Sequence, residues 1–266
     1  VSRIGASDPV RITLKGSDRT GLVIKLKPLT RVSGTVEIEK LDPAVACSFG
    51  RVTPMPLNIL QLASRSRGGP ANPPVSASAS PDEKGSFTFD GVVPGPQRLK
   101  ISSLEASYFL KKISLPVGVQ TSAGEKQSSR DASEKIDATL NPSLAGLRIV
   151  VAEGAGAVSG KISAEMDDEL QVVLVPEEKE RLSMNTSYRI AQVRDRVFNL
   201  RNVPPGKYRI FTKRLANDAA IDNDLVPDLD SEARQTLRNE AETKGKQIEI
   251  GVCQKLVEVI IPAPQK

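Results

Sequence analysis

Two groups of carboxylates have the chemistry needed to hydrolyse a glycosidic bond. They flank the apolar run 170–175, and their members are Asp167, Asp168, Glu169, Glu177, Glu178 and Glu180. A glycosidase uses two carboxyl groups, one as the acid and the other as the base or nucleophile. Charged residues also gather at the turns around a strand, and no cluster of aromatic residues stands beside these groups. The spacing therefore favours two solvated turns over a catalytic pair.

A second acidic stretch carries the oxygen ligands that calcium prefers. Its members are Asp218, Asp222, Asp224, Asp228, Asp230 and Glu232. The spacing does not match an EF-hand, because Val226 stands where the third oxygen ligand is needed and no glycine follows. Asp228 or Asp230 can instead accept hydrogen bonds from the free N–H groups at the start of a helix. The pattern favours a solvated, helix-capping loop, and an irregular calcium loop stays open as the alternative.

The composition excludes most other catalytic chemistry. The 266 residues include no histidine, so no Ser-His-Asp triad, Cys-His pair or imidazole metal site can form. Cys47 and Cys253 are too few to hold an iron–sulfur cluster or a four-thiolate zinc site. A disulfide between them is open in an oxidising compartment, and two separate buried thiols are favoured over it. We expect a protein that is not an enzyme and uses no cofactor or metal.

The charge and hydropathy patterns of the chain indicate which classes of partner to expect. The formal net charge is +5, with 18 basic and 11 acidic residues in 1–133 and 19 basic and 21 acidic residues in 134–266. The cations mostly alternate with apolar residues, as Arg11 and Lys15 do, which is typical of the wet face of a strand. No apolar run approaches the length of about 18 residues that a membrane-spanning helix needs. We expect neither a nucleic-acid partner nor a transmembrane segment. Because the first residue is Val1, we expect a processed chain or an excised fragment.

Four side chains are candidate contacts for a partner. Arg65 and Arg67 lie in a stretch of Ser, Gly, Pro and Ala that predicts a long loop over residues 64–81. Their charge suits an acidic polysaccharide or an acidic protein surface. Tyr108 and Phe109 adjoin an alternating strand, so at least one of the two rings is expected to face outward and anchor a partner.

The chain repeats itself at an offset of more than 100 residues. Val32–Val36 recurs as Val158–Ile162, and Phe87–Gly95 recurs as Phe198–Gly206, in the same order. Apolar and polar residues alternate with a period of two through both copies, with Gly and Pro between the runs. This alternation is typical of antiparallel strands with one buried and one wet face. The sequence therefore predicts a mainly β protein of tandem antiparallel β-sandwiches, of the prealbumin or immunoglobulin type.

The repeat sets the expected domain boundaries. We expect a first sandwich over residues 30–133 and a second over residues 134–266, which closes with a hairpin at 246–262. One short helix is expected at about 229–243, lying against the sheet as a crossover and ending at Gly245. Its narrow apolar stripe recurs every four residues, at Leu229, Ala233, Leu237 and Ala241.

Residues 1–29 are similar to the end of a preceding repeat. They hold two alternating runs around a turn, like the pairs at 136–151 and 248–261. Strands with unpaired edges seek partners. This N-terminal hairpin can fold onto the first sandwich, pair with a neighbouring copy or belong to an upstream domain. Its candidate pairing edge consists of Val10, Ile12, Leu14, Leu22, Ile24 and Leu26.

A distinctive string connects the second copy to a known family. The Val-Ser-Gly strand at 158–162 is followed at 198–210 by a Phe-x-Leu-x-x-Val-Pro-Pro-Gly-Lys-Tyr-Arg-Ile run. These segments resemble the carboxypeptidase regulatory-like domain family, whose relatives are the transthyretin-like and collagen-adhesin B-type sandwiches. The first copy keeps the turn but has Gln97 where the second has Tyr208. The resemblance implies two tandem sandwiches with a non-catalytic role, placed in the periplasm, at the cell surface or outside a bacterial cell.

Together these patterns predict a non-enzymatic structural or assembly protein of the bacterial envelope or exterior. It would act as a β-sandwich scaffold, a spacer or a subunit of a larger assembly such as a filament. Other protein subunits or further copies of the chain are the expected partners. The alternative is an accessory module that binds envelope polysaccharide or a protein partner.

Overall fold

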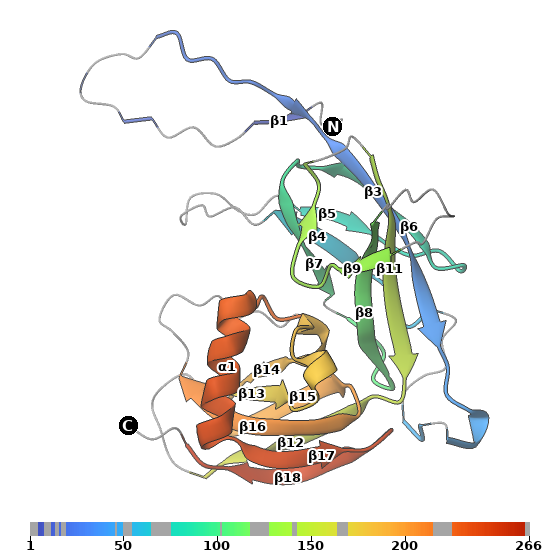
Figure 1. Cartoon of the computed structure of the whole chain (residues 1–266), viewed down its shortest axis with the longest axis vertical. Coiled ribbons are helices and arrows are strands. Elements are labelled where there is room, and N and C mark those ends of the chain that lie inside the picture. Colours follow the sequence, from blue (N-terminus) through green and yellow to red (C-terminus); the bar gives the residue numbers. More distant parts are fainter. Residues whose placement is uncertain are drawn as a thin grey trace.

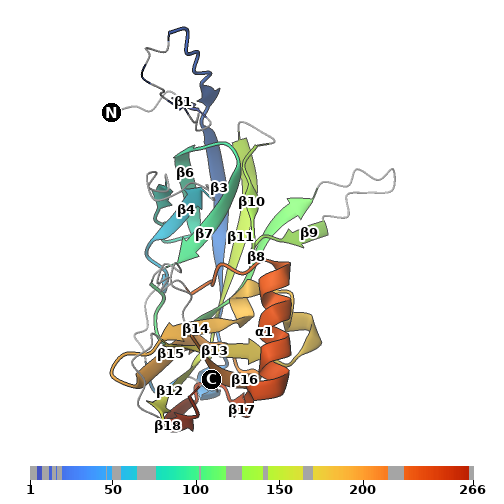
Figure 2. The same ribbon diagram turned by 90° about the vertical axis from the view of Figure 1, so that its left-hand side faces the viewer.

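The computed structural model shows two β-sandwiches stacked along the long axis of the molecule (Figure 1 and, turned by 90°, Figure 2). The residues that it describes are 5–7, 12–13, 16, 20–45, 47–49, 55–64, 76–101, 103–117, 128–139, 143–163, 170–214 and 225–263. The prediction of a mainly β fold with one helix near the C-terminus is confirmed. No helix in these ranges is long and apolar enough to cross a membrane.

The first sandwich packs a five-stranded sheet on a four-stranded one. The five-stranded sheet has the order β6-β3-β11-β8-β9, with β3 Thr30–Glu39, β6 Ser86–Val92, β8 Tyr108–Val117, β9 Ser128–Asp131 and β11 Ser143–Glu153. The four-stranded sheet has the order β10-β7-β4-β5, with β4 Leu60–Ser64, β5 Ser76–Ala79, β7 Pro96–Ile101 and β10 Ile136–Asp137. A 3-10 turn, η1, follows β3 at Pro43–Val45. The apolar side chains of both inner faces meet in one core, as the alternation predicts.

The second sandwich packs a three-stranded sheet on a four-stranded one. The three-stranded sheet has the order β15-β12-β18, with β12 Gly156–Ile162, β15 Val197–Val203 and β18 Lys255–Ile261. The other has the order β14-β13-β16-β17, with β13 Leu170–Pro176, β14 Arg189–Gln192, β16 Gly206–Arg214 and β17 Lys246–Ile250. Two 3-10 turns lie between β13 and β14, η2 at Lys179–Arg181 and η3 at Asn185–Ser187.

The helix α1, Ser231–Lys244, covers the outer face of the four-stranded sheet and packs on β13 and β16. The side chain of Asp230 accepts a hydrogen bond from the N–H of Ala233 at 2.8 Å, which confirms one of the two predicted caps. Leu237 and Ala241 of the predicted stripe are buried against Phe211. The bounds of the helix were therefore predictable to within two residues at its start and one at its end. The predicted crossover is wrong, because α1 joins β16 to its antiparallel neighbour β17 in the same sheet.

The two sandwiches share one connectivity, so the sequence repeat is also a repeat of topology. In each, the opening strand pairs antiparallel with one strand and parallel with the closing strand: β3 with β6 and β11, and β12 with β15 and β18. The second sheets match in the same way, β4, β5, β7 and β10 corresponding to β13, β14, β16 and β17. Among the described elements the copies differ after β7 and β16, where the hairpin β8–β9 stands in the first copy and α1 in the second.

This connectivity corrects the predicted boundary between residues 133 and 134. Strands β10 and β11 follow residue 133 in the chain but pair with β7, β3 and β8 of the first sandwich. The parallel pairing of a closing strand with an opening strand explains the error, because it brings the end of a repeat back to its start. The sheet of the first sandwich ends at Glu153, and β12 begins three residues later.

The same connectivity shows that the predicted closing hairpin at 246–262 is wrong. Strand β17 pairs with β16 and β18 pairs with β12, so the two strands belong to opposite sheets. They form an arch over the end of the sandwich, as β10 and β11 do in the first copy. Alternation marks a strand but does not reveal its partner, and a short turn serves an arch as well as a hairpin. An arch requires a sandwich between its two strands.

The predicted long loop at 64–81 is also partly wrong. Residues 76–79 form β5, which pairs antiparallel with β4 from Ala79 opposite Leu60 to Ser76 opposite Ala63. Alanine and serine are weak strand formers, so composition gave no signal for this strand. The segment is held as a strand by its backbone pairing with β4, although its side chains favour a strand only weakly.

The turns before β7 and β16 explain why the second copy has Tyr208 where the first copy has Gln97. The hydroxyl of Tyr208 donates to the carbonyl of Pro204 at 2.7 Å. The amide of Gln97 donates to the carbonyl of Val93 at 2.8 Å. Both side chains are buried, and each reaches back four residues to satisfy a turn carbonyl. Gln97 therefore performs the same task as Tyr208 with a different donor.

The glycine of each Val-Ser-Gly segment is required by close approach of the closing strand. A Cβ on Gly34 would overlap the carbonyl oxygen of Leu147 in β11, and a Cβ on Gly160 would overlap that of Val259 in β18. The ladder between these strands shifts register at both places. The repeated glycine thus marks the parallel contact that closes each sandwich.

Gly160→Ala is expected to lower the free energy of unfolding by about 1–3 kcal/mol, because the added methyl group forces β12 and β18 apart. Urea denaturation followed by circular dichroism measures the change. Gly251→Ala is the matched control, since a Cβ there would meet only the flexible side chain of Gln254. Equal stabilities of the two variants would contradict the close-approach explanation.

Candidate functional site

The junction between the two sandwiches is the most highly organised polar region of the described chain. A strap at 225–229, which leads into α1, crosses from the second sandwich to the first. Val226 of the strap is fully buried in the first core. The N–H of Leu225 donates to the carbonyl of Ile101 at 3.1 Å, and the guanidinium of Arg98 donates to the carbonyl of Val226 at 2.6 Å. The strap therefore belongs to both packing units.

Asn202 at the end of β15 also holds the two units together. Its side-chain amide donates to the carbonyls of Glu105 and Tyr108 at 2.8 Å and of Leu104 at 3.4 Å, all in the first sandwich. Its backbone is left-handed, with φ of 54°, and the matching position in the first copy is Gly91, with φ of 72°. Asparagine tolerates this conformation better than most residues. The second copy thus keeps the turn and adds a side chain that spans the junction.

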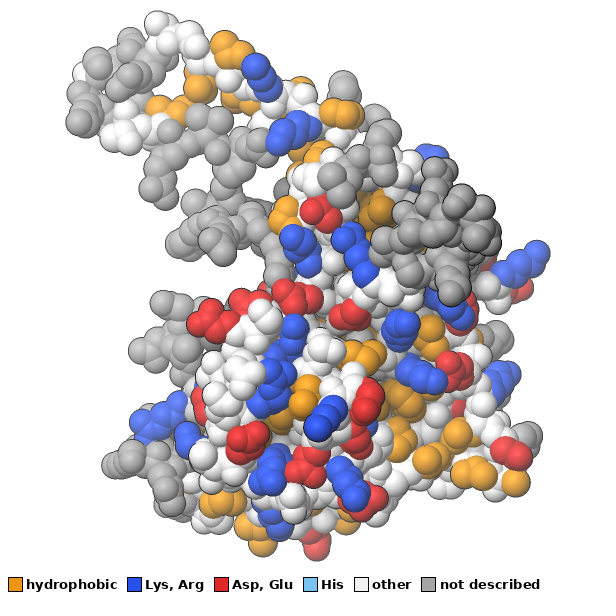
Figure 3. All heavy atoms as spheres, in the orientation of Figure 1, with side chains coloured by type: hydrophobic (Ala, Val, Ile, Leu, Met, Phe, Trp, Pro, Cys, Tyr) orange, Lys and Arg blue, Asp and Glu red, His pale blue; other side chains and the backbone are white. Residues whose placement is uncertain are grey.

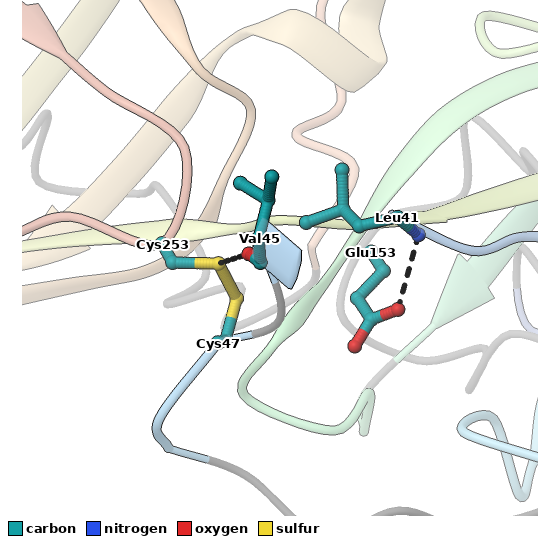
Figure 4. Close-up of a disulfide and its surroundings, with 5 residues drawn as sticks. All are labelled: Leu41, Val45, Cys47, Glu153 and Cys253. Carbon is teal, nitrogen blue, oxygen red and sulfur yellow. Dashed lines mark hydrogen bonds between the residues drawn. A yellow bond between two sulfur atoms is a disulfide. The ribbon is translucent and has the colours of Figure 1, made fainter. Parts of the chain in front are cut away.

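A disulfide links the sandwiches on another side of the junction (Figure 4). Cys47 lies after η1, and Cys253 lies in the arch between β17 and β18, with Cα atoms 5.1 Å apart. The N–H of Cys253 donates to the carbonyl of Gly154, and the N–H of Leu41 donates to the carboxylate of Glu153. The preference for two separate buried thiols is therefore wrong. The residues are 206 positions apart, so only the tertiary structure could bring them together.

A buried polar network completes the junction beside α1. Arg234 of α1 forms an ion pair with Glu134 at 2.9 Å and also donates to the side chain of Asn185 at 2.7 Å. The N–H of Asn185 donates to the hydroxyl of Ser133, and the hydroxyl of Thr186 donates to the carbonyl of Lys111, both at 3.3 Å. With the strap, Asn202 and the disulfide, this network fastens the two sandwiches at several separate points.

Arg189 of β14 is a buried cation next to the junction. It donates to the carbonyls of Thr186 and Tyr188 at 2.7 Å and of Asn202 at 2.6 Å. Among the residues that the structure describes, its Nε has no hydrogen-bond partner. Burial lowers the pKa of Arg189 to about 10, so the side chain stays charged at neutral pH. A hollow of about 710 Å³ borders this residue, and its other lining residues come from both sandwiches.

Of the four predicted partner contacts, the structure describes two, Tyr108 and Phe109. Tyr108 is 3% exposed and packs in the first core, so its expected role as a surface anchor is wrong. Burial raises the pKa of Tyr108, and the charges of Glu153 and Glu105 raise it further. Phe109 is half-buried in β8. Arg65 and Arg67 lie outside the described residues. The alternation correctly marks the strand, because Tyr108 and Leu110 are buried whereas Phe109 is half-buried and Lys111 is exposed.

Four of the predicted acidic groups have structural partners. Glu177 forms an ion pair with Arg209 at 2.9 Å, and Glu178 accepts from the N–H of Lys207 at 2.8 Å. Asp230 caps α1, and Asp228 lies 3.8 Å from Arg98. Within the described ranges, no group of three or more Cys, Asp or Glu is placed to hold a metal ion. Glu180 in η2 and Glu232 in the first turn of α1 are exposed. The other predicted carboxylates lie outside these ranges: Asp167, Asp168, Glu169, Asp218, Asp222 and Asp224.

An N-terminal arm, comprising the described residues between 5 and 28, projects beyond the first sandwich (Figure 1). It contains one short ladder, in which β1 (Gly5–Ala6) pairs with β2 (Lys27–Pro28). Residues 20–26 form neither helix nor strand. Figure 3 shows hydrophobic side chains along this arm. The exposed fractions are 47% for Ile12, 52% for Leu22, 75% for Val23, 54% for Ile24 and 64% for Leu26. Val10 and Leu14 of the predicted edge lie outside the described residues.

Comparison with known proteins gives distant likenesses in structure only. No family model matches the chain, and no curated protein matches it. Among solved structures, it is similar to GBS52, the minor pilin of Streptococcus agalactiae, with 8% identity over 89% of this chain and 97% of that one, at a TM-score of 0.26. The TIE protein of Bacillus anthracis gives 11% identity and a TM-score of 0.25. A leucine-rich repeat protein of Bacteroides thetaiotaomicron gives 10% and 0.32.

Each of the last two likenesses covers 89% of this chain, which spans 33% of the Bacillus protein and 27% of the Bacteroides protein. TM-scores this far below 0.5 carry no argument, so the function is argued from the residues of this chain.

Proposed function

We propose that this chain is a non-enzymatic structural protein of the bacterial envelope or exterior, acting as a rigid spacer within a larger assembly. The junction is the observation that carries the proposal. Val226 of one unit lies in the core of the other, Asn202 spans the boundary, and Cys47 and Cys253 are joined across it. Two tandem domains joined by a flexible linker would transmit little force or orientation. Two domains fastened in this way keep a fixed spacing between their ends.

The disulfide supports an exported location. Disulfides persist in oxidising surroundings such as the periplasm or the cell exterior, and they are rare in the reducing cytosol. The resemblance to carboxypeptidase regulatory-like and collagen-adhesin B-type sandwiches points to the same locations. The family label itself is part of the proposal, and the repeated Val-Ser-Gly strand and Pro-Gly turn support it.

The arm supports a role in assembly. Its two alternating runs match the sequence of the arches β10–β11 and β17–β18, whose strands enter opposite sheets of a sandwich. Within the arm only Gly5–Ala6 and Lys27–Pro28 are seen to pair, and the exposed run at 20–26 forms no strand. We infer that the arm pairs with the edge of a sheet on a neighbouring copy, since both sandwiches of the chain already hold their own closing strands, β11 and β18. Because donor and acceptor surfaces differ, such contacts continue head to tail and produce an open filament.

Self-association of the purified chain tests this proposal. Sedimentation velocity over a range of concentrations is expected to show association that increases with concentration. Replacing Leu22, Ile24 and Leu26 with serine should leave a monomer, because the apolar surface that drives the contact is lost. The melting temperature should not change, since these side chains are exposed.

The matched control is Ile59→Ser with Val197→Ser, which also removes exposed apolar side chains, 47% and 45% exposed, but outside the arm. This control should associate like the original chain. A chain that stays monomeric at every concentration contradicts pairing between copies, and equal loss in the control contradicts a specific role of the arm.

A further inference from the structure

The hollow at the junction has a lining that is cationic and lacks acidic residues. Three arginines border it, Arg189, Arg194 and Arg201, all from the second sandwich. The first sandwich contributes Ser103, Leu104 and Ala106, and the strap contributes Leu225. No Asp or Glu is among the lining residues that the structure describes. A hollow of about 710 Å³ lies in the size range of sites for small ligands.

None of the three arginines of this lining forms an ion pair with a described carboxylate; Arg189 is buried, and Arg194 and Arg201 are exposed. Arg189 is 4% exposed and makes its hydrogen bonds to backbone carbonyls, without a carboxylate among its described partners. Arg194 donates to the side chain of Gln192, and Arg201 has no ion pair among the described residues. Buried charges in proteins are ordinarily paired, because desolvation of an unpaired charge costs several kcal/mol. An anion in the hollow would supply the missing negative charge.

The remaining lining residues narrow the chemical class of the anion. Gln192 and Asn199 place side-chain amides at the hollow, and these groups form hydrogen bonds with hydroxyls. Ala191, Leu104 and Leu225 add apolar surface that suits the C–H face of a sugar ring. Exposed guanidinium groups bind carboxylates and sulfates through paired, charge-assisted hydrogen bonds.

We propose that this hollow binds an acidic oligosaccharide, with its carboxylate or sulfate groups held by Arg194 and Arg201. Both sandwiches line the site, so it exists only when the junction is formed. The proposal does not depend on the arm or on self-association.

Isothermal titration calorimetry of the full chain with defined oligosaccharides tests the site. The probes are an oligogalacturonate, which carries carboxylates, a sulfated chondroitin oligosaccharide, and neutral maltotetraose as the uncharged control. At least one acidic probe should bind, with an affinity that falls as salt rises, and the neutral probe should not. Arg194→Gln with Arg201→Gln should weaken binding by about 10–100-fold, because two charge-assisted contacts are lost.

Arg130→Gln with Lys161→Gln is the matched control, because it removes two exposed cations that do not line the hollow. Its affinity should stay that of the original chain, and both double variants should keep the original melting temperature. Equal weakening in the control, or no binding of either acidic probe, overturns the proposal. Tighter binding of an oligoglutamate peptide than of both acidic sugars also overturns it, since the site would then recognise acidic protein.

Discussion

Replacing both Cys47 and Cys253 with alanine is expected to lower the free energy of unfolding by about 2–5 kcal/mol. The bond joins residues 206 positions apart, so it restricts the unfolded chain over most of its length. It also fastens η1 of the first sandwich to the arch of the second, and its loss removes one of the attachments at the junction. Urea denaturation, followed by circular dichroism, gives the change in free energy.

Two further samples make this test specific. The unaltered chain treated with a thiol reductant should lose about as much stability as the alanine variant. Ser48→Ala, at an exposed position next to Cys47, should keep the full stability. If the reductant and the double substitution both leave the denaturation midpoint unchanged, the disulfide does not stabilise the junction.

Asn202→Ala is expected to lower the free energy of unfolding by about 3 kcal/mol. The substitution removes the two short hydrogen bonds of the amide, to the carbonyls of Glu105 and Tyr108, and the loss of such a bond costs about 1–3 kcal/mol. Alanine also tolerates the left-handed backbone of this position poorly, which adds about 1 kcal/mol. Chemical denaturation of the full chain measures the sum.

A second substitution at the same position separates the two causes. Asn202→Gly keeps the left-handed turn, as Gly91 does in the first copy, and removes only the amide. It should therefore lose about 1 kcal/mol less than Asn202→Ala. Asn199→Ala, at an exposed position on the same strand, should change stability little. Full stability of Asn202→Gly would show that the amide does not hold the sandwiches together.

Much of the fold could be predicted from the repeat in the sequence. Period-two alternation identified the strands, and the spacing of Leu237 and Ala241 identified the helix that Asp230 caps. Both are local signals, because a strand or helix must turn its apolar side chains toward one core. The glycines of the two Val-Ser-Gly segments carried a longer-range signal. Their repetition marks the places where a closing strand approaches too closely for a side chain.

The candidate site was much less accessible to sequence analysis. Tyr108 and Phe109 were selected as an aromatic pair, and the structure buries the first of them. Asn202 and Arg189 were not selected, although one signal existed: Asn202 stands where the first copy has Gly91. A residue that replaces a turn glycine within a repeat can have a role that the glycine lacks, such as a side-chain hydrogen bond. Arg189 carried no such signal, because its burial depends on segments far away in the chain.

Residue types and local periodicity alone are enough to show that the protein is built of strands, that its pattern of strands occurs twice, and that histidine-dependent chemistry is absent. These conclusions depend on residue type and on periodicity over a few positions. The folded chain was needed to show which strands pair, where one sandwich ends, that Cys47 is bonded to Cys253, and which arginines line one hollow. Those facts depend on contacts between residues up to about two hundred positions apart. Many pairings of similar alternating strands satisfy the same local pattern, and the packing of the whole chain selects among them.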